Sequence, residues 1–138
     1  MGDEVKVSTG MKHEGGRTKC VFSGHADLDV AGMSEIDGHP EAWSPPHMLV
    51  ASIESCFFLT LAAVAEKMRI EIESYSSTAE GKLTSADGKH KEVSEVVIRP
   101  TIRLKDEANR AKLPQLFSRA EEYCYVARSV KTKVRIES

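Results

Sequence analysis

The residues of this sequence best suited to chemistry are its three cysteines, Cys20, Cys56 and Cys124. A thiolate is a nucleophile, and a pair of thiols can be oxidised to a disulfide and reduced again. None of the three belongs to a CxxC motif, and the five histidines show no metal-ligand spacing, so we expect no metal site. An odd, low cysteine count and a polar N-terminus without an apolar signal region predict free thiols in a cytoplasmic protein.

The composition indicates one globular domain that spans residues 1–138. Hydrophobic residues make up 41% of the chain and charged residues 29%, which is the ordinary range for a chain that folds in water. The formal net charge is -2, so no overall basic balance attracts nucleic acid or an anionic membrane. We therefore expect a small or apolar ligand rather than nucleic acid or lipid as a partner.

A long helix is predicted around Cys56. Ser44 supplies a capping hydroxyl and Pro45 suits the first helical turn, so the helix should begin there and run to about Arg69. Apolar side chains occupy nearly every face, which is typical of a core helix. Polar residues such as Glu54 interrupt the run before it reaches the ~18 uninterrupted apolar residues of a membrane span.

The other segments predict strands and a second helix, and hence an α+β fold. Turn residues and partial alternation predict strands within 4–30, 70–83, 93–104 and 131–138. The Asp87-Gly88 turn joins the second and third of these as a hairpin, and residues 31–43 form an irregular connection. Helical spacing over 106–123 predicts a second helix that ends near Cys124, with Pro114 close to its first turn or at a kink.

Two segments resemble the osmotically inducible and organic hydroperoxide resistance (OsmC/Ohr) family. SPPHMLVASIESCFFLTLAAVA is similar to its core-helix motif, in which a Ser/Asn-Pro start precedes a cysteine, and Pro45 falls eleven residues before Cys56 as it does there. EEYCYVARSVKTKVRIES resembles the segment of the second cysteine, although Tyr125 stands where a proline is common. The order of predicted elements agrees over nearly the whole chain.

The resemblance implies both a fold and a reaction. The fold would be an antiparallel sheet with a long buried core helix and a second helix, in an intertwined homodimer. The protein would be an enzyme that reduces hydroperoxides, especially organic ones: the Cys56 thiolate attacks the O–O bond, and Cys124 resolves the sulfenic acid as an intramolecular disulfide. An external dithiol, of lipoyl type or a small thiol, would reset the pair without a cofactor, and Cys20 would be a bystander.

The thiol at Cys56 needs a cation, because the helix start is about three turns away and its dipole fades within the first turn. In the family an N-terminal arginine has this role, and Arg17 is the only arginine before the core helix. The family's glutamate, ten or nine residues before the cysteine, is replaced here by Pro46 and His47. Glu41 and Glu54 are the candidates for the missing carboxylate.

Three further residues are candidates for binding substrate. Phe57 and Trp43 could line an apolar approach to Cys56, and the ring of His47 could hydrogen-bond a peroxide. The departure at Pro46 and His47 leaves an alternative open. A divergent member could keep the dimeric scaffold and bind a small apolar ligand, or sense redox state, without efficient peroxidase activity.

Overall fold

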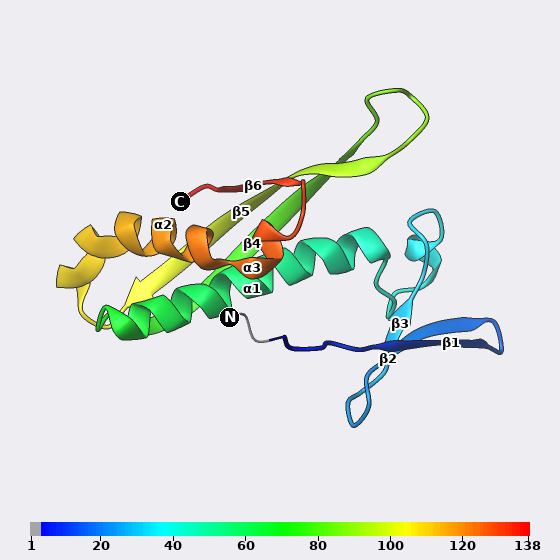
Figure 1. Ribbon diagram of the computed structural model, residues 1–138, viewed down its shortest axis with the longest axis horizontal. Coiled ribbons are helices and arrows are strands. Elements are labelled where there is room, and N and C mark those ends of the chain that lie inside the picture. Colours follow the sequence, from blue (N-terminus) through cyan, green and yellow to red (C-terminus); the bar gives the residue numbers. More distant parts are fainter. Residues whose placement is uncertain (1–3) are drawn as a thin grey trace. The chain divides into compact units, whose positions relative to one another are not determined.

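The computed structural model describes residues 4–138, which form two compact units. The first unit reaches Met48, and the second runs from Leu49 to the C-terminus. Helix α1 (Pro45–Lys67) begins at the end of the first unit and continues into the second (Figure 1). Each unit is built around one three-stranded sheet, so the predicted α+β class is confirmed.

The first unit holds an antiparallel sheet in the order β1 (Gly10–Glu14), β2 (Arg17–Val21) and β3 (Leu28–Val30). Gly15 and Gly16 turn the chain between the first two strands with φ angles of 62° and 74°, a left-handed conformation that glycine adopts without steric cost. The connection to α1 is irregular as predicted, with one short 3-10 helix, η1 (Ile36–Gly38).

Helix α1 starts where the sequence predicts. The Ser44 hydroxyl accepts a hydrogen bond from the His47 backbone N–H at 3.2 Å, which satisfies one of the free donors of the first turn. The helix ends at Lys67, two residues before the expected Arg69, because Arg69 itself has a φ of 58° and turns the chain out of the helix.

The second unit has a mixed sheet in the order β4 (Ile72–Thr84), β5 (Glu92–Leu104) and β6 (Lys133–Ile136). The first two strands form the predicted antiparallel hairpin, but β6 pairs with β5 in parallel, so this sheet is not wholly antiparallel. A parallel pair needs a long crossover between its strands. The helical segment between β5 and β6 supplies that crossover.

This crossover contains η2 (Glu107–Lys112), α2 (Leu113–Tyr123) and α3 (Tyr125–Arg128). Pro114 lies in the first turn of α2, where its missing N–H breaks no helical bond. The sequence predicted one helix that ends near Cys124. The structure adds α3, because Cys124 has an extended ψ of 99° and the chain resumes a helical course after it.

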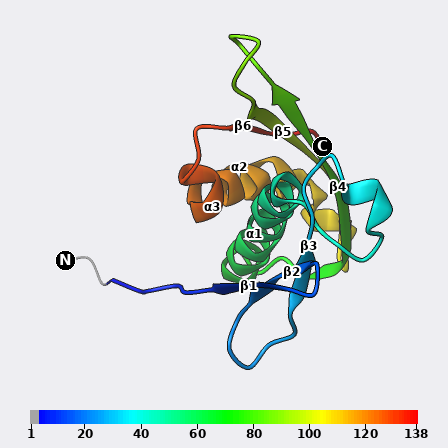
Figure 2. The same cartoon turned by 90° about the vertical axis from the view of Figure 1, so that its right-hand side faces the viewer.

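One face of the second sheet carries the core. Figures 1 and 2 show α1, α2 and α3 on the same side of β4 and β5. Only one side of α1 is buried, since Leu59 is 66% exposed while Leu61 is fully buried. By length and apolar composition α1 would also suit a membrane span, a test that core helices pass too. The buried side chains at the centre of this core are Ile53, Cys56, Phe57, Leu61, Ile98, Leu116, Ala120 and Cys124.

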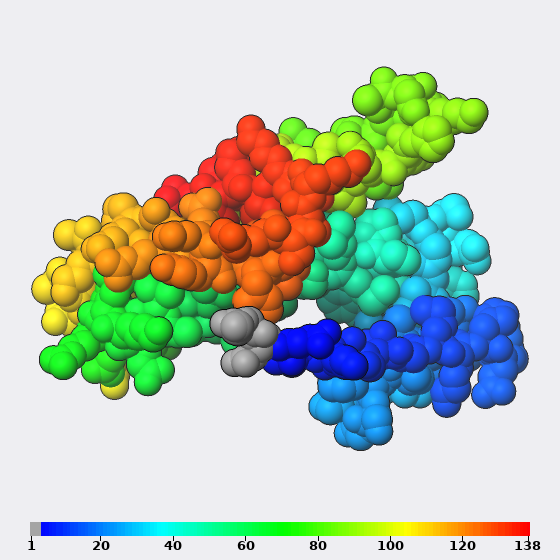
Figure 3. All heavy atoms as spheres, in the orientation of Figure 1, coloured from blue at the N-terminus to red at the C-terminus, as the bar shows by residue number. Residues whose placement is uncertain are grey.

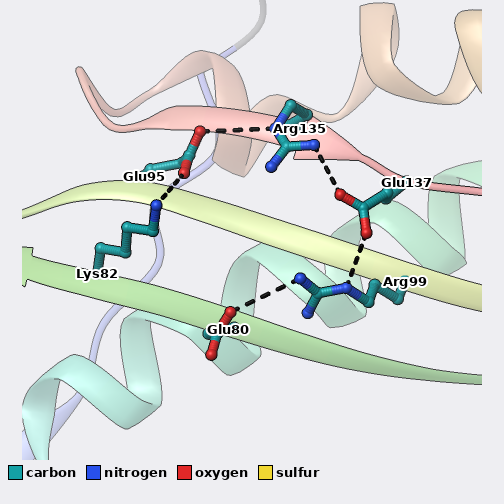
Figure 4. Close-up of polar contacts among 6 residues, drawn as sticks. All are labelled: Glu80, Lys82, Glu95, Arg99, Arg135 and Glu137. Atoms are coloured by element: carbon teal, nitrogen blue, oxygen red, sulfur yellow. Dashed lines mark hydrogen bonds and ion pairs between the residues drawn. The ribbon is translucent and has the colours of Figure 1, made fainter.

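The opposite face of this sheet carries a ladder of ion pairs (Figure 4). Arg99 bonds Glu137 at 2.9 Å, and Arg135 bonds the same carboxylate at 2.8 Å, which joins β5 to the residues at the end of β6. Val97 lies opposite Glu80 on β4 and Arg135 on β6, and it is buried although it points away from the helices. The long charged side chains of the neighbouring residues therefore cover Val97 on the outer face.

Candidate thiol site

Cys56 and Cys124 meet in the core of the second unit. Cys56 lies in the middle of α1 and is 8% exposed, whereas Cys124 lies between α2 and α3 and is 1% exposed. Both are free thiols and both belong to the same hydrophobic cluster. The fold thus brings together two sulfur-bearing residues that are 68 positions apart in the sequence.

The surroundings of Cys124 favour its protonated form. Burial raises the pKa of the Cys124 thiol, and the neighbouring Cys56 thiol raises this pKa further. The backbone N–H groups of Ala127 and Val126 act in the opposite direction but do not outweigh burial. A desolvated thiol loses its proton less readily than one in water. Cys124 is therefore a thiol rather than a thiolate at neutral pH.

Packing holds Cys56 in place. Its sulfur lies 3.9 Å from the hydroxyl oxygen of Thr60, one helical turn further along α1. The adjacent Phe57 is buried and packs against Phe117 of α2, with ring centroids 6.3 Å apart. The contact between Phe57 and Phe117 holds α1 against α2. Because Cys56 precedes Phe57 and Cys124 follows α2, this contact also positions the two thiols.

Glu54 faces a different part of the unit. Its carboxylate accepts a hydrogen bond from the Ser77 hydroxyl of β4 at 2.5 Å. Residues two apart on an α-helix point about 200° apart, so Glu54 and Cys56 project from different sides of α1. The Glu54 carboxylate therefore links α1 to β4.

A cavity of about 200 Å³ adjoins Cys124. Most of its wall is apolar, and two charged side chains, Glu121 and Arg128, also line it. Burial raises the pKa of the Glu121 carboxyl. The lining residues come from α1, α2, α3 and the C-terminal segment: Ile53, Phe57, Glu121, Cys124, Ala127, Arg128, Thr132, Val134 and Ile136.

The sequence analysis named neither Glu121 nor Arg128 as a candidate site residue, and both are exposed at the rim of this cavity. Glu121 lies in the last turn of α2, three residues before Cys124, so its closeness in sequence was the local signal. Arg128 reaches the cavity because α3 follows Cys124, and this short helix was not predicted.

The remaining predicted site residues belong to the first unit. The Arg17 guanidinium donates a hydrogen bond to Asp29 at 2.8 Å, and these residues line a cavity of about 330 Å³ together with Glu41. The His47 ring nitrogen Nδ1 lies 2.6 Å from the Ser44 hydroxyl, so the histidine is tied to the helix cap.

The other first-unit residues lie on strands or beside them. The backbone of Trp43 bridges to Val30 of β3 while the indole side chain is partly exposed. Cys20 is half-buried on β2, where it faces Met11 of β1 and Leu28 of β3. Within residues 4–138 no three His, Cys, Asp or Glu side chains cluster in a way that would hold a metal ion.

Comparison with known proteins agrees with this architecture. An uncharacterised Bacillus subtilis protein, YmaD, is 27% identical over 120 residues, which is 85% of this chain and 79% of that protein. An OsmC-like protein of unknown function from Vibrio cholerae is 26% identical, with a TM-score of 0.76 over 88% of this chain and 82% of that one.

A Legionella pneumophila structure, described as an organic hydroperoxide resistance protein OsmC, has the same fold. It is 23% identical, with a TM-score of 0.72 over 97% of this chain and 96% of that one. A family model described as OsmC-like protein matches residues 38–138, which include both core cysteines. The chain belongs to the OsmC-like protein family.

Proposed function

We propose that this protein is a thiol peroxidase that reduces organic hydroperoxides with Cys56 and Cys124. The observation that carries the proposal is the meeting of two free, interacting thiols in one buried core, on elements far apart in the sequence. Its substrate class is supported by relatives of the same fold that are described as organic hydroperoxide resistance proteins, from Legionella pneumophila and Bacillus subtilis.

The two cysteines take different roles because their surroundings differ. Cys56 is the more exposed of the two and lies beside the Thr60 hydroxyl, so it is the better placed to meet a peroxide. The raised pKa of Cys124 suits a group that stays protonated until a sulfenic acid forms next to it. Cys56 is therefore the peroxide-reactive residue and Cys124 the resolving residue.

The reaction balances as two successive displacements. The Cys56 thiolate attacks the terminal peroxide oxygen, the O–O bond breaks, and the alkoxide takes a proton and leaves as the alcohol. The Cys124 sulfur then attacks the Cys56 sulfenic acid, loses its proton, and forms the disulfide with release of water. Two thiols are oxidised for each hydroperoxide reduced, and two electrons from an external dithiol regenerate the pair.

The apolar exposure on α1 supports a homodimer. Leu59 is exposed on the side of α1 that the core leaves open, and only 28% of the most apolar stretch of this helix is buried, so a second copy of the chain could cover the rest. Light scattering of the purified protein should give twice the mass of one chain. A monomeric mass would remove the dimer from the proposal without affecting the thiol chemistry.

The thiol chemistry is tested by titration with cumene hydroperoxide. One equivalent should consume two thiols per chain and shift the protein on a non-reducing gel. Cys56→Ser and Cys124→Ser should each abolish the shift, while the matched control Cys20→Ser keeps it. Thiols that survive the peroxide in the folded protein would exclude a peroxidase and leave a scaffold that binds a small ligand.

A further inference from the structure

The buried hydroxyl of Ser44 has more neighbours than its single proton can serve. Its oxygen lies 2.6 Å from Nδ1 of His47 and 3.1 Å from the sulfur of Met33, and it accepts a hydrogen bond from the His47 backbone N–H at 3.2 Å. Ser44 is fully buried, so water does not compete for these contacts. All three residues belong to the first unit. The position of the Ser44 proton therefore determines whether His47 or Met33 receives a hydrogen bond.

We propose that Met33 is a site of oxidation by hydroperoxides, and that His47 controls this oxidation by holding or releasing the Ser44 proton. The product of the modification is methionine sulfoxide. The reaction uses no cysteine, so the inference goes beyond the proposed function and does not depend on it.

Met33 is accessible to a peroxide. The residue is 46% exposed and lies in the irregular connection between β3 and α1. Figure 3 shows this connection, residues 31–43 in light blue to cyan, at the surface of the first unit. An exposed thioether is a polarizable sulfur that peroxides convert to the sulfoxide. Met33 thus combines access for an oxidant with a contact that can tune its sulfur.

A neutral imidazole leaves the Met33 sulfur free. A hydroxyl has one proton to donate, an imidazole nitrogen without a proton is an acceptor, and a thioether is only a weak acceptor. The contact from Ser44 to Nδ1 of His47 is also the shorter of the two. Ser44 then donates to His47, and the lone pairs of the Met33 sulfur remain available to attack a peroxide.

A protonated imidazole reverses this arrangement. Both imidazolium nitrogens are donors, so Nδ1–H of His47 donates to the Ser44 oxygen. That oxygen then accepts from Nδ1–H and from the His47 backbone N–H, which fills both of its acceptor positions. The Ser44 proton turns to the Met33 sulfur at 3.1 Å and engages one of its lone pairs. Acid therefore protects Met33 from oxidation.

The charge of His47 acts through Ser44 in this part of the molecule. Within residues 4–138 no hydrogen bond or ion pair joins the imidazole to a charged side chain, and the helix residues one turn further on, Val50 and Ala51, are uncharged. Histidine ordinarily changes its charge between about pH 5 and 8. The titratable side chains that line a cavity together with Pro45, two residues earlier, are His13, Arg17, Asp29, Glu35, His39 and Glu41.

The oxidation balances without another reactant. The Met33 sulfur attacks the terminal oxygen of the hydroperoxide, a sulfur–oxygen bond forms as the O–O bond breaks, and the hydroperoxide proton passes to the alkoxide, which leaves as the alcohol. The sulfur loses two electrons and the hydroperoxide gains them. A sulfoxide is more polar than a thioether, so its oxygen is a better acceptor for the Ser44 proton. Oxidation therefore changes the hydrogen bonding at the cap of α1.

The experiment compares two methionines in the same sample. The protein is treated with an excess of tert-butyl hydroperoxide at about pH 8 and at about pH 5, which brackets the ordinary titration of histidine. Sulfoxide at Met33 and at Met11 is then quantified by proteolysis and mass spectrometry. Met11 is 63% exposed on β1 and serves as the internal standard. The ratio of Met33 to Met11 oxidation should be about threefold or more lower at the acidic pH, because a hydrogen bond to the sulfur must first break.

Two variants should hold this ratio at opposite levels. His47→Ala leaves the Ser44 proton to Met33 at both pH values, so the ratio should stay low. Ser44→Ala removes the donor, so the ratio should stay high. The control His39→Ala removes an exposed imidazole from the same connection and should keep the pH dependence of the unchanged protein. If circular dichroism shows that Ser44→Ala does not fold, the His47→Ala variant decides alone.

Three results would overturn the inference. They are the absence of sulfoxide at Met33, a ratio that does not change with pH in the unchanged protein, and a pH dependence that persists in His47→Ala. The thiols are not part of this measurement. A failure of Cys56 or Cys124 to react with peroxide would end the proposed function and leave the oxidation of Met33 as it is.

Discussion

The two units of this protein give thiols contrasting surroundings. Cys56 and Cys124 in the second unit are buried among apolar side chains, whereas Cys20 in the first unit is half-buried on a small sheet with many exposed charged residues. Burial positions the two thiols and protects them, and at Cys124 it also favours the protonated form. The first unit offers the reverse, since Arg17 provides a positive charge and Asp29 orients it.

The contrast teaches that position and activation are separate requirements. The second unit meets the requirement for position, because its core holds Cys56 and Cys124 on or beside packed helices. Activation of Cys56 needs a cation, and the sequence analysis assigned that role to Arg17. The following predictions test each side of this contrast.

The largest effect is expected in the second unit's core. Leu61→Ala removes a fully buried side chain and should lower the free energy of unfolding by about 2–5 kcal/mol. Leu59→Ala changes the same residue type at an exposed site on the same helix and should cost well under that amount. Urea denaturation followed by circular dichroism measures both. Equal losses would show that Leu59 is covered in solution.

The next effect concerns thiol reactivity. In the reduced protein, iodoacetamide should modify Cys20 about tenfold or more faster than Cys124, because Cys124 is buried and its burial also raises the pKa of its thiol. Peptide mapping after short exposures gives the rate at each cysteine. If Cys124 reacts as fast as Cys20, the second unit opens often enough that its burial does not protect the thiol.

A smaller effect tests the cation. Arg17→Ala should slow the alkylation of Cys56 by iodoacetamide across its pH profile, because a nearby cation favours the reactive form of a thiol. Arg119→Ala removes an exposed arginine from α2 and serves as the control. An unchanged profile for Arg17→Ala would remove this residue from the site and leave activation to another group.

The smallest effect is expected in the ion-pair ladder of the second sheet. Arg135 and Arg99 hold the pKa of Glu137 below its ordinary value, and Lys82 does the same for Glu95. A carboxyl whose pKa is lower in the folded state stabilises the folded protein at pH values above the pKa of the unfolded state. This contribution is lost as the pH falls through the pKa of the folded state. The urea midpoint should therefore decrease slightly below about pH 4.5, and less so in Glu137→Gln. If the urea midpoint of Glu137→Gln decreased as much as that of the unchanged protein, a group other than Glu137 would be responsible for the pH dependence.

Several features followed from local patterns and were predictable. Ser44 caps α1 because its hydroxyl, placed just before the proline-led apolar run, can accept a hydrogen bond from a free backbone N–H of the first turn. The β4–β5 hairpin follows from alternating residues on either side of an Asp-Gly turn. These features depend on neighbours within a few positions, which the sequence displays directly.

Other features depend on distant residues. The parallel pairing of β6 with β5 requires the whole crossover to pack, so no pattern within Lys133–Ile136 reveals its direction. Glu54 looked like a neighbour of Cys56 in sequence, yet the helix turns it toward Ser77 on β4. The cavity beside Cys124 takes its walls from separate elements, which no single motif encodes.

The sequence alone was enough to name Cys56 and Cys124 as candidate residues, on elements of recognisable type and within an OsmC-like order of helices and strands. The folded structure was needed to show that these two residues share a core, that Cys124 is the more deeply buried, and that a cavity adjoins it. The physical reason is that residue type and local propensity are written along the chain, whereas burial, pKa and access arise from packing between distant segments.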